Sequence, residues 1–130
     1  LLYVADDPAP RRWPSDLLRD GRLVVSSTSE VYGADRTVDP RRQLATFEDV
    51  LAEAQRDGYA GVRVLADNTS LVDDVGDRLH AWLEWERLAD EFMGHHPVTG
   101  LCGFDRSRLD SALVQELLDL HDRTVPSDDR

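Results

Sequence analysis

Polar and acidic side chains follow each predicted strand, and this pattern is the one in the chain most able to support chemistry. Residues 6–7 (Asp-Asp) follow the apolar run LLYVA, Asp67 follows VRVLA, and Asp105 follows TGLCGF. Residues 26–30, which end in a Glu, follow RLVV. Ligands of open α/β sheets bind beyond the carboxyl ends of the strands, so these positions predict a shared acidic pocket. The alternative is that they are ordinary turn and cap residues.

An apolar strand that ends in an acidic residue is also typical of nucleotide hydrolases, where the carboxylate binds magnesium. Residues 61–67, GVRVLAD, have this form. Such an enzyme also needs a glycine-rich loop with a Lys, GxxxxGK[ST], to hold the phosphates. The chain has no Lys, and proline-rich sequence follows its first strand. We therefore expect no catalytic residues, cofactor or metal, with a hydrolase that uses the strand-end carboxylates and magnesium as the alternative.

One carboxylate falls on an apolar helix face. At 100° per residue the predicted helix 77–93 places Trp82 and Trp85 in a wide apolar arc, and Glu86 lies inside that arc. Burying an unpaired carboxylate costs several kcal/mol, so Glu86 needs a partner. The alternatives are a salt bridge to an Arg such as Arg63, a side chain that reaches out to solvent, and a bound ligand.

Cysteine and histidine give no independent site. The single cysteine, Cys102, cannot form an internal disulfide and is expected to fill a strand position as a small apolar residue. His95 and His96 are adjacent, and no HxxxH or CxxC pattern lies near them, so a zinc site is not predicted. The spacing of the Ser and His residues indicates no catalytic triad.

Alternating strands and helices must position these residues. Short apolar runs predict the strands, and apolar residues at helical spacing predict the helices. Asp39 as N-cap and Pro40 at the first helical position mark the clearest helix start, and residues 28–38 are expected to form a loop. The expected elements are a strand at 1–4, a short helix at 15–19, a strand at 22–27, a helix from 40 to about 58, a strand at 62–66, a helix at 77–93, a strand at 99–104 and a helix at 110–121.

This order predicts an α/β fold with three layers, in which helices flank a mostly parallel sheet. Parallel strands must be joined by right-handed crossovers, and those crossovers place helices against the sheet. We expect one domain at residues 1–122 and a linker or tail at 123–130. Because a domain rarely starts in mid-strand, an N-terminal strand and helix are expected to precede residue 1.

Composition limits the partners. The 130 residues are 41% hydrophobic, which is enough for one domain with its own core. A net charge of -11 argues against binding to nucleic acid or an anionic membrane. No apolar run approaches the roughly twenty residues that span a bilayer, and no signal-peptide pattern opens the chain, so a cytoplasmic location is expected. All fifteen basic residues are Arg. This indicates a high-G+C bacterium, with the acidic surface of a halophile as the alternative explanation.

Several stretches together resemble a known family. They are LYVADD, SEVYG, VDPRRQLATFEDVLAEAQRDGYAGVRVLAD and LEWERLADEFMGHHPVTGLCGFDRSRLD. The chain resembles the MEDS family, a sensory domain named for methanogens, methylotrophs and the dichloromethane-responsive repressor, from about residue 2 to 118. The most specific matches are DGYxGxRV at 57–64, the Trp-Glu pair at 85–86 and HPVTxLCxFD at 96–105.

The resemblance implies a relative of the RecA and KaiC type of ATPase that has lost its phosphate-binding loop and senses small organic molecules. It also implies partners, because such domains often precede an anti-sigma-factor-type kinase domain or a STAS domain; a homodimer is considered as well. The chain departs from the family in residues 67–70, DNTS, where many members have a Glu followed by Met and Trp. Carried over by position, the family's marked residues fall on Glu30, Tyr32, Asp67, Glu86, Cys102 and Asp105.

We therefore expect a non-catalytic sensory domain of a bacterial signalling or sigma-factor-type transcription regulator. Its acidic groups would hydrogen-bond the polar or cationic end of a small organic ligand, while aromatic residues would cover the apolar part. A further alternative is an interaction module of a stress-regulator cascade, whose partner would contact the helix around Trp82 and Trp85. The expected pocket is lined by Asp67, Glu86 and Asp105, with Cys102 and Tyr32 nearby.

Overall fold

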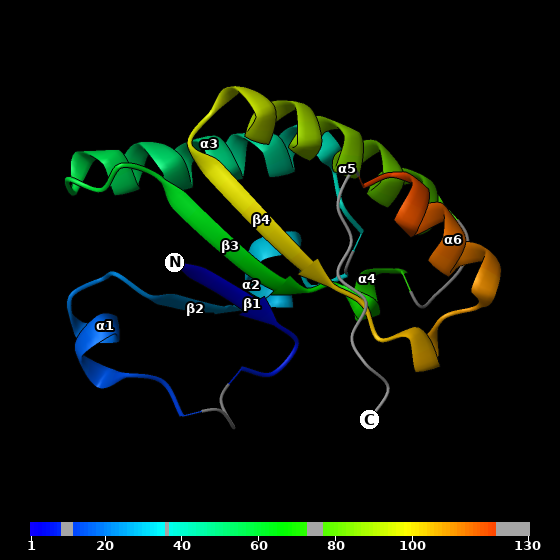
Figure 1. The fold of residues 1–130 in the computed structure, drawn as a ribbon, viewed down its shortest axis with the longest axis horizontal. Helices are drawn as coiled ribbons and strands as arrows, with labels where there is room; N and C mark the ends of the chain where they lie inside the picture. Colours follow the sequence, from blue (N-terminus) through cyan, green and yellow to red (C-terminus); the bar gives the residue numbers. More distant parts are fainter. Residues whose placement is uncertain (9–11, 36, 73–76, 122–130) are drawn as a thin grey trace.

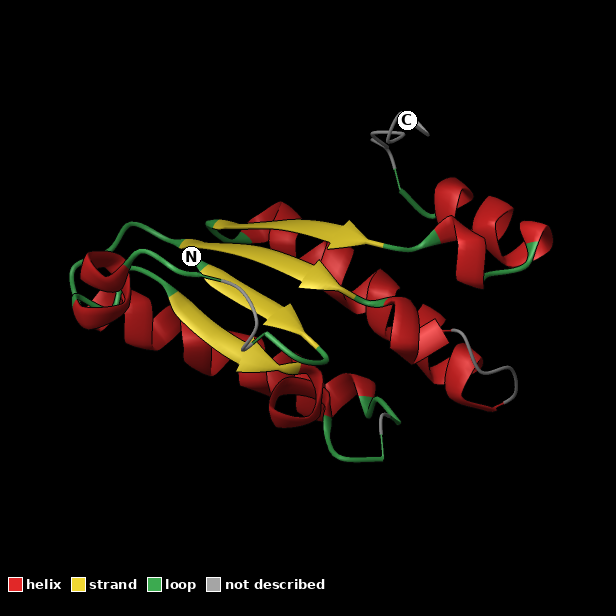
Figure 2. Cartoon of the chain, turned by 90° about the horizontal axis from the view of Figure 1, so that it is seen from below, coloured by secondary structure: helices red, strands yellow, loops and turns green. Residues whose placement is uncertain are grey.

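A computed structural model describes residues 1–8, 12–35, 37–72 and 77–121, and Figures 1 and 2 show their arrangement. In these residues four parallel strands form a sheet in the order β2-β1-β3-β4. Helices flank the sheet, so the predicted α/β class is confirmed. The strands are β1 (Leu2–Ala5), β2 (Val24–Ser27), β3 (Val62–Asp67) and β4 (Val98–Gly103).

The helices connect successive parallel strands, as the predicted alternation requires. The long ones are α3 between β2 and β3 and α5 between β3 and β4, and both lie against the same face of the sheet (Figure 1). The helices are α1 (Ser15–Arg19), α2 (Thr28–Tyr32), α3 (Pro40–Arg56), α4 (Thr69–Val72), α5 (Asp77–His95) and α6 (Ser111–Asp119), with a 3-10 turn η1 (Arg106–Arg108) before α6.

Helix α3 begins where the sequence predicts. The Asp39 side chain accepts a hydrogen bond from the Arg42 backbone N–H at 3.2 Å, and Pro40 occupies the first turn. The Asp39 cap satisfies one free backbone N–H at the helix start, and Pro40 has no backbone N–H that would need a partner there. Phe47 and Leu51, one turn apart, are buried in the core. The sequence therefore determines both the start of α3 and the face that packs on the sheet and on α5.

The main core lies between the sheet and the layer formed by α3 and α5. Burial alternates along β3, where Val62, Val64 and Ala66 are buried and the residues between them are exposed. Trp82 and Trp85 of α5 are buried in the same cluster. This alternation fixes which β3 side chains can meet α5, and it places Arg63 on the other face of the sheet.

The second face of the sheet is only partly covered. Helix α1 and Trp13 pack over the β1 side, against Tyr3, whose ring centroid lies 4.6 Å from that of Trp13. Farther across the sheet Leu65 is 38% exposed and Leu101 is 59% exposed. These two residues are paired neighbours on β3 and β4. The third layer in the described residues is therefore confined to the β1 and β2 side.

The parallel register brings the four carboxyl ends to one edge of the sheet. Val4 of β1 is level with Ser26 of β2 and with Ala66 of β3, and Ala66 is level with Cys102 of β4. The polar segments after the strands therefore start side by side, as the sequence predicts. Two of these segments form short helices, α2 and α4, where the sequence was interpreted as loop.

Two expectations concern the ends and the environment of the chain. The predicted linker at residues 123–130 lies outside the described residues. Within the described part, no helix is both long and apolar enough to cross a membrane.

Candidate functional site

Thr69 joins the ends of β3 and β4. Its hydroxyl donates to Asp67 Oδ1 at 2.9 Å, and the same hydroxyl oxygen accepts the Asp105 backbone N–H at 2.8 Å. The Thr69 side chain is buried, whereas Asp67 and Asp105 are exposed. One hydroxyl thus links the Asp67 carboxylate to the Asp105 backbone at the edge of the sheet.

Asp105 is also the N-cap of η1. Its carboxylate accepts the Ser107 hydroxyl at 2.6 Å and the Ser107 backbone N–H at 3.0 Å. These hydrogen bonds favour the ionised form and lower the pKa of Asp105. Asp105 is therefore a fixed surface anion at the mouth of the strand ends.

Glu30 lies in a capping box at the start of α2. Its carboxylate accepts the Ser27 backbone N–H at 2.8 Å, and its own N–H donates to the Ser27 hydroxyl at 3.2 Å. This reciprocal pair stabilises the turn from β2 into α2, which carries Tyr32 inward. Glu30 is exposed, so the contact shown by the structure is the cap.

A polar cluster lies beneath these surface residues, and we define the buried polar cluster as the buried residues Tyr32, Asn68, Trp82 and Glu86 with the half-buried Cys102. The Tyr32 ring meets the Trp82 ring edge-on at 5.8 Å. Burial raises the pKa of Tyr32, and the nearby Cys102 and Glu86 raise it further. Burial first and the Glu86 charge second raise the pKa of the Cys102 thiol to about 12, and a contact with the Asn68 side chain that does not meet hydrogen-bond geometry lowers it slightly. Tyr32 and Cys102 therefore remain protonated at neutral pH.

Several atoms in and beside this cluster have no hydrogen-bond partner among the described residues. They include both polar atoms of the Asn68 amide and the Trp82 indole nitrogen, and Asn68 and Trp82 are 1% and 0% exposed. The Thr28 hydroxyl at the end of β2 is also buried and unpartnered. Each buried, unsatisfied polar group costs about 1–3 kcal/mol. A bound molecule with its own donors and acceptors would remove this cost.

Glu86 has a partner, but it is not the predicted Arg63. The Glu86 carboxylate is 8% exposed and lies 2.9 Å from Nε2 of His121, just after α6. Arg63 cannot reach it, because the alternation of β3 places Arg63 on the opposite face of the sheet. The hydrogen bond to Glu86 is the largest effect on His121 and raises its pKa to about 9. At neutral pH the pair is therefore ionic.

The structure divides the six predicted site residues into two levels. Tyr32, Glu86 and Cys102 belong to the buried cluster, whereas Asp67, Asp105 and Glu30 lie at the surface around the strand ends. No group of three or more His, Cys, Asp or Glu side chains suited to a metal ion occurs among the described residues.

Sequence reasoning missed three residues here. Asn68 lies in the segment that the sequence predicts to follow a strand, but the pattern of apolar and polar residues there does not predict that it is buried. Thr28 begins a helix whose capping box, Ser27 with Glu30, was visible in the sequence. His121 lies far from Glu86 along the chain, and no spacing rule connects them.

The helix face around Trp82 and Trp85 is not a surface. These residues are 0% and 3% exposed, since they fill the core between α5 and the sheet. The predicted partner contact at this face is therefore wrong. An interaction surface, if the domain uses one, must lie elsewhere.

A family of proteins matches the chain in sequence. Neither a curated protein nor a solved structure matches the chain. The sequence model of the MEDS family, described as the methanogen/methylotroph, DcmR sensory domain, matches residues 6–122. This match spans most of the chain, including both the surface carboxylates and the buried polar cluster, and so the chain belongs to the MEDS family of sensory domains.

Proposed function

We propose that this sensory domain binds a small organic molecule in the buried polar cluster and reports it to a regulatory partner without catalysis. The observation that supports the proposal is the set of buried, unpartnered polar atoms of Asn68 and Trp82 at the carboxyl ends of the strands. Ligands of parallel α/β sheets bind at this edge. Membership of the MEDS family supports the sensory role, and the residues indicate the chemistry of the ligand.

The cluster suits a ligand with one polar end and a small apolar body. The Trp82 N–H and the Asn68 NH2 group are donors that need acceptors, such as a hydroxyl or carbonyl oxygen, and the Asn68 carbonyl oxygen needs a donor. The Tyr32 hydroxyl remains protonated and supplies a further donor. The rings of Tyr32, Trp82 and Trp85 would cover the apolar part. A cationic end would instead be drawn to Glu86.

Helix α6 is the proposed output element. Leu113 and Leu117 dock it on the core, and the ion pair from His121 to Glu86 holds its carboxyl end. A ligand that hydrogen-bonds Glu86 would compete with His121 and favour the released position of α6. Such a shift requires that the ligand bind the two positions of α6 with different affinities. The receiving partner would be a STAS or anti-sigma-type kinase domain of a transcription regulator.

A thermal-shift screen of the chain tests this function. The panel contains short-chain alcohols, amides and amines, with Mg-ATP as the probe for the hydrolase alternative. A ligand at 100 times its Kd adds about 2.7 kcal/mol of stability, which raises Tm by several degrees in a domain of this size. We expect an alcohol or amide to raise Tm in the wild type and not in Asn68→Leu. A shift with Mg-ATP alone would contradict the proposal.

A matched control separates loss of the site from loss of a surface amide. Gln55 is exposed on α3, far from the strand ends, so Gln55→Leu removes the same chemical group without touching the cluster. We expect this variant to keep the full ligand shift. If Asn68→Leu keeps it too, the ligand does not occupy the buried polar cluster.

A further inference from the structure

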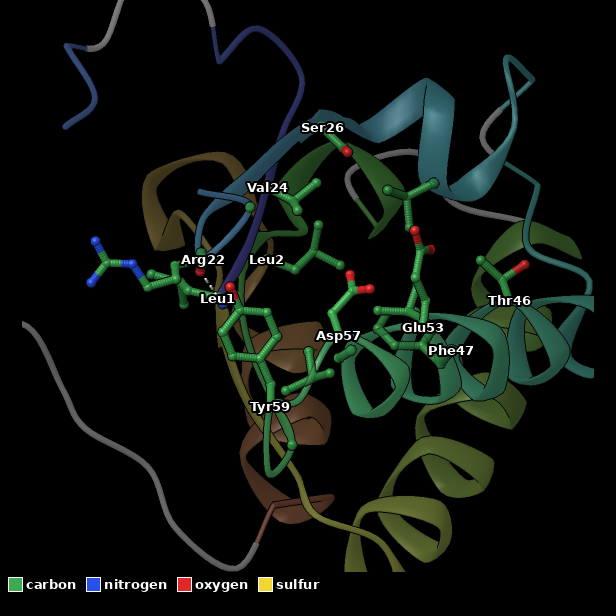
Figure 3. Close-up of a pocket in the computed structure, with 16 residues that line it drawn as sticks. Leu1, Leu2, Arg22, Val24, Ser26, Thr46, Phe47, Glu53, Asp57 and Tyr59 are labelled. Carbon is green, nitrogen blue, oxygen red and sulfur yellow. Dashed lines mark hydrogen bonds between the residues drawn. The ribbon is translucent and has the colours of Figure 1, made fainter. Parts of the chain in front are cut away.

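A cavity of about 370 Å³ lies between the edge strand β2 and helix α3, near the amino ends of the strands (Figure 3). Its volume falls within the roughly 300–1,000 Å³ typical of small-molecule pockets. It shares no residue with the buried polar cluster, which lies at the carboxyl ends of the strands. Its apolar walls are formed by Leu2, Val24, Val31, Phe47, Val50 and Ala54.

Two carboxylates give the cavity a negative side. Glu53 and Asp57 line it from the last turn and C-cap of α3, and Figure 3 shows both carboxylates directed toward the space between α3 and β2. Both side chains are exposed, and no ion pair joins either of them to another described residue. A cation that entered the cavity would therefore find two anionic acceptors already in place.

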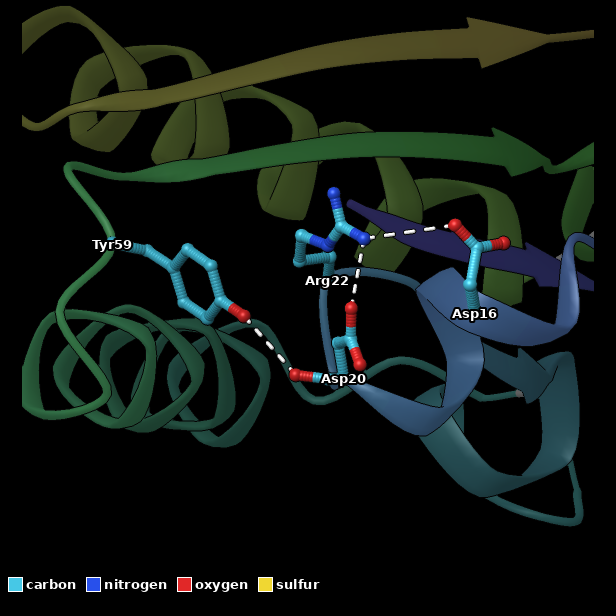
Figure 4. A network of polar contacts seen from close by, with 4 residues as sticks. All are labelled: Asp16, Asp20, Arg22 and Tyr59. Carbon is cyan, nitrogen blue, oxygen red and sulfur yellow. Dashed lines mark hydrogen bonds and ion pairs between the residues drawn. The ribbon is translucent and has the colours of Figure 1, made fainter.

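The basic groups at this end are engaged elsewhere. The Arg22 guanidinium lies 2.8 Å from Asp20 Oδ2 and 3.7 Å from Asp16 Oδ2, and Figure 3 shows it directed away from the cavity. Figure 4 shows the same network, in which the Tyr59 hydroxyl donates to the Asp20 carbonyl at 3.2 Å. The terminal ammonium group of Leu1, a residue that also lines the cavity, donates to the Arg22 carbonyl at 2.7 Å. The Arg22 guanidinium therefore does not pair with Glu53 or Asp57.

The end of α3 adds to the negative potential. The dipoles of an α-helix sum to about half a negative charge at its carboxyl end, which favours cations there. Helix α3 has 17 residues and ends at Arg56, beside the two carboxylates. Arg56 itself does not line the cavity. Apolar walls, two carboxylates and a helix carboxyl end together select for a cation with an apolar body.

We propose that this cavity is a second binding site, one that takes small amphiphilic cations, meaning a primary ammonium group on a short apolar or aromatic body. The ammonium group would lie between Glu53 and Asp57, and the body would pack among Leu2, Val24 and Phe47. The site stands on its own geometry and does not depend on binding at the strand ends.

The test uses benzylamine and its neutral analogue benzyl alcohol, titrated into the chain with amide chemical shifts as the readout. We expect benzylamine to bind at least fivefold more tightly than benzyl alcohol and to shift amides of β2 and of the last turns of α3. In the double variant Glu53→Gln, Asp57→Asn, the affinities for benzylamine and benzyl alcohol should become equal. Val24→Trp, at an exposed edge-strand position, should fill the cavity and weaken both ligands.

A matched control removes the effect of net charge. Glu48→Gln, Asp49→Asn also removes two carboxylates from α3, but both positions are exposed and outside the cavity. This variant should keep the preference for benzylamine. Loss of the preference in the control, or its survival in the Glu53→Gln, Asp57→Asn variant, would overturn the proposal. Shifts confined to the carboxyl ends of the strands would overturn it as well.

Discussion

Glu86 and His121 form a pair in which both imidazole nitrogens meet hydrogen-bond acceptors. Nε2 lies 2.9 Å from the Glu86 carboxylate, and Nδ1 lies 2.7 Å from the Leu117 carbonyl oxygen. Only the doubly protonated ring can donate to both. Besides Glu86 and Leu117, the nearby charge of Asp90 favours this cation, whereas partial burial opposes it. The pair thus ties the charge state of one histidine to the docking of α6.

We expect the ion pair to be lost in alkaline solution. The pKa of His121 is raised from 6.5 to about 9 in the folded chain, so its stabilising effect is complete below pH 6.5 and is lost as pH rises through about 9. Allowing for solvent screening at a side chain that is 31% exposed, we expect a loss of about 1–2 kcal/mol. Urea unfolding at pH 6.5, 8 and 10 measures it.

Two other groups contribute to alkaline stability over this range. Burial raises the pKa of Cys102 from 9.0 to about 12 and raises the pKa of Tyr32 above its usual 10.0, so each loses stabilising effect as pH rises through its unfolded value. The titration is therefore made in a Cys102→Ala background, in a chain that has no Lys. In that background His121→Gln, which keeps a donor for Glu86 but cannot carry the charge, should reduce the pH dependence between 8 and 10. An unchanged pH profile in this variant would show that another group controls alkaline stability.

Asn68 is expected to limit the stability of the unliganded domain. Its buried amide has no partner among the described residues, and an apolar side chain of similar size would remove that cost. We expect Asn68→Leu to raise the free energy of unfolding by about 1 kcal/mol, with Gln55→Leu within about 0.5 kcal/mol of the wild type. Chemical denaturation measures both. A loss of more than about 1 kcal/mol in Asn68→Leu would mean that the amide is satisfied in the native domain.

At the scale of elements, local signals predicted most of the framework. The Asp39-Pro40 start of α3 and the short apolar strands depend on neighbouring residues alone, and they were predicted correctly. The start of α2 was interpreted as loop although Ser27 and Glu30 form a capping box. The Glu86–His121 pair depends on how α6 packs against α5. No periodicity within either helix contains that information.

The same limit applies to the candidate site. The convergence of polar segments at one sheet edge followed from parallel topology. The pocket predicted from the family resemblance combined Glu86 with Asp67 and Asp105, whereas in the structure Glu86 is buried and the two Asp residues are exposed. The burial of Asn68 and Thr28 could not be predicted, because it arises from short helices that cover the strand ends. The cavity beside β2 was not predicted either, since it depends on the distance between α3 and an edge strand.

The entry to β3 requires a glycine at position 61. A Cβ there would collide with the Pro97 carbonyl oxygen and lie 2.9 Å from Pro97 Cβ. This close approach lets the Val62 N–H donate to the same carbonyl at 2.9 Å, at the start of the β3–β4 pairing. We expect Gly61→Ala to separate the two strands at this point and to destabilise the fold by about 1–3 kcal/mol.

Gly94 provides the control for that substitution. It lies in α5, where a Cβ added to it would meet no other atom within 4 Å, and its φ is not positive. Gly94→Ala should therefore stabilise the domain by about 0.5–1 kcal/mol, because it lowers the entropy of the unfolded chain. Thermal and urea unfolding of both variants measure the two changes in the free energy of unfolding, which should have opposite signs. Equal effects would show that the contact between residue 61 and Pro97 relaxes without cost.

At the scale of the whole molecule, acidic residues outnumber basic residues. The chain has 26 acidic residues and 15 Arg residues, and the described surface pairs of Arg22 already share one cation between two carboxylates. The uncovered face of β3 and β4 adds exposed Leu65 and Leu101 to this acidic surface. Repulsion among like charges is therefore a cost that the fold carries in dilute buffer, and the core between the sheet and the α3–α5 layer must offset it.

We expect salt to stabilise the domain and to do so mainly at low concentration. The Debye length falls from about 30 Å at 0.01 M to about 8 Å at 0.15 M, which screens most repulsion between surface charges. Tm should rise steeply between about 0.01 and 0.2 M NaCl and then level off, because screening saturates. The Glu48→Gln, Asp49→Asn variant, with a net charge of about -9, should start at a higher Tm and respond less. A Tm that stays flat to about 0.2 M would show that the Arg–carboxylate contacts already balance the acidic surface.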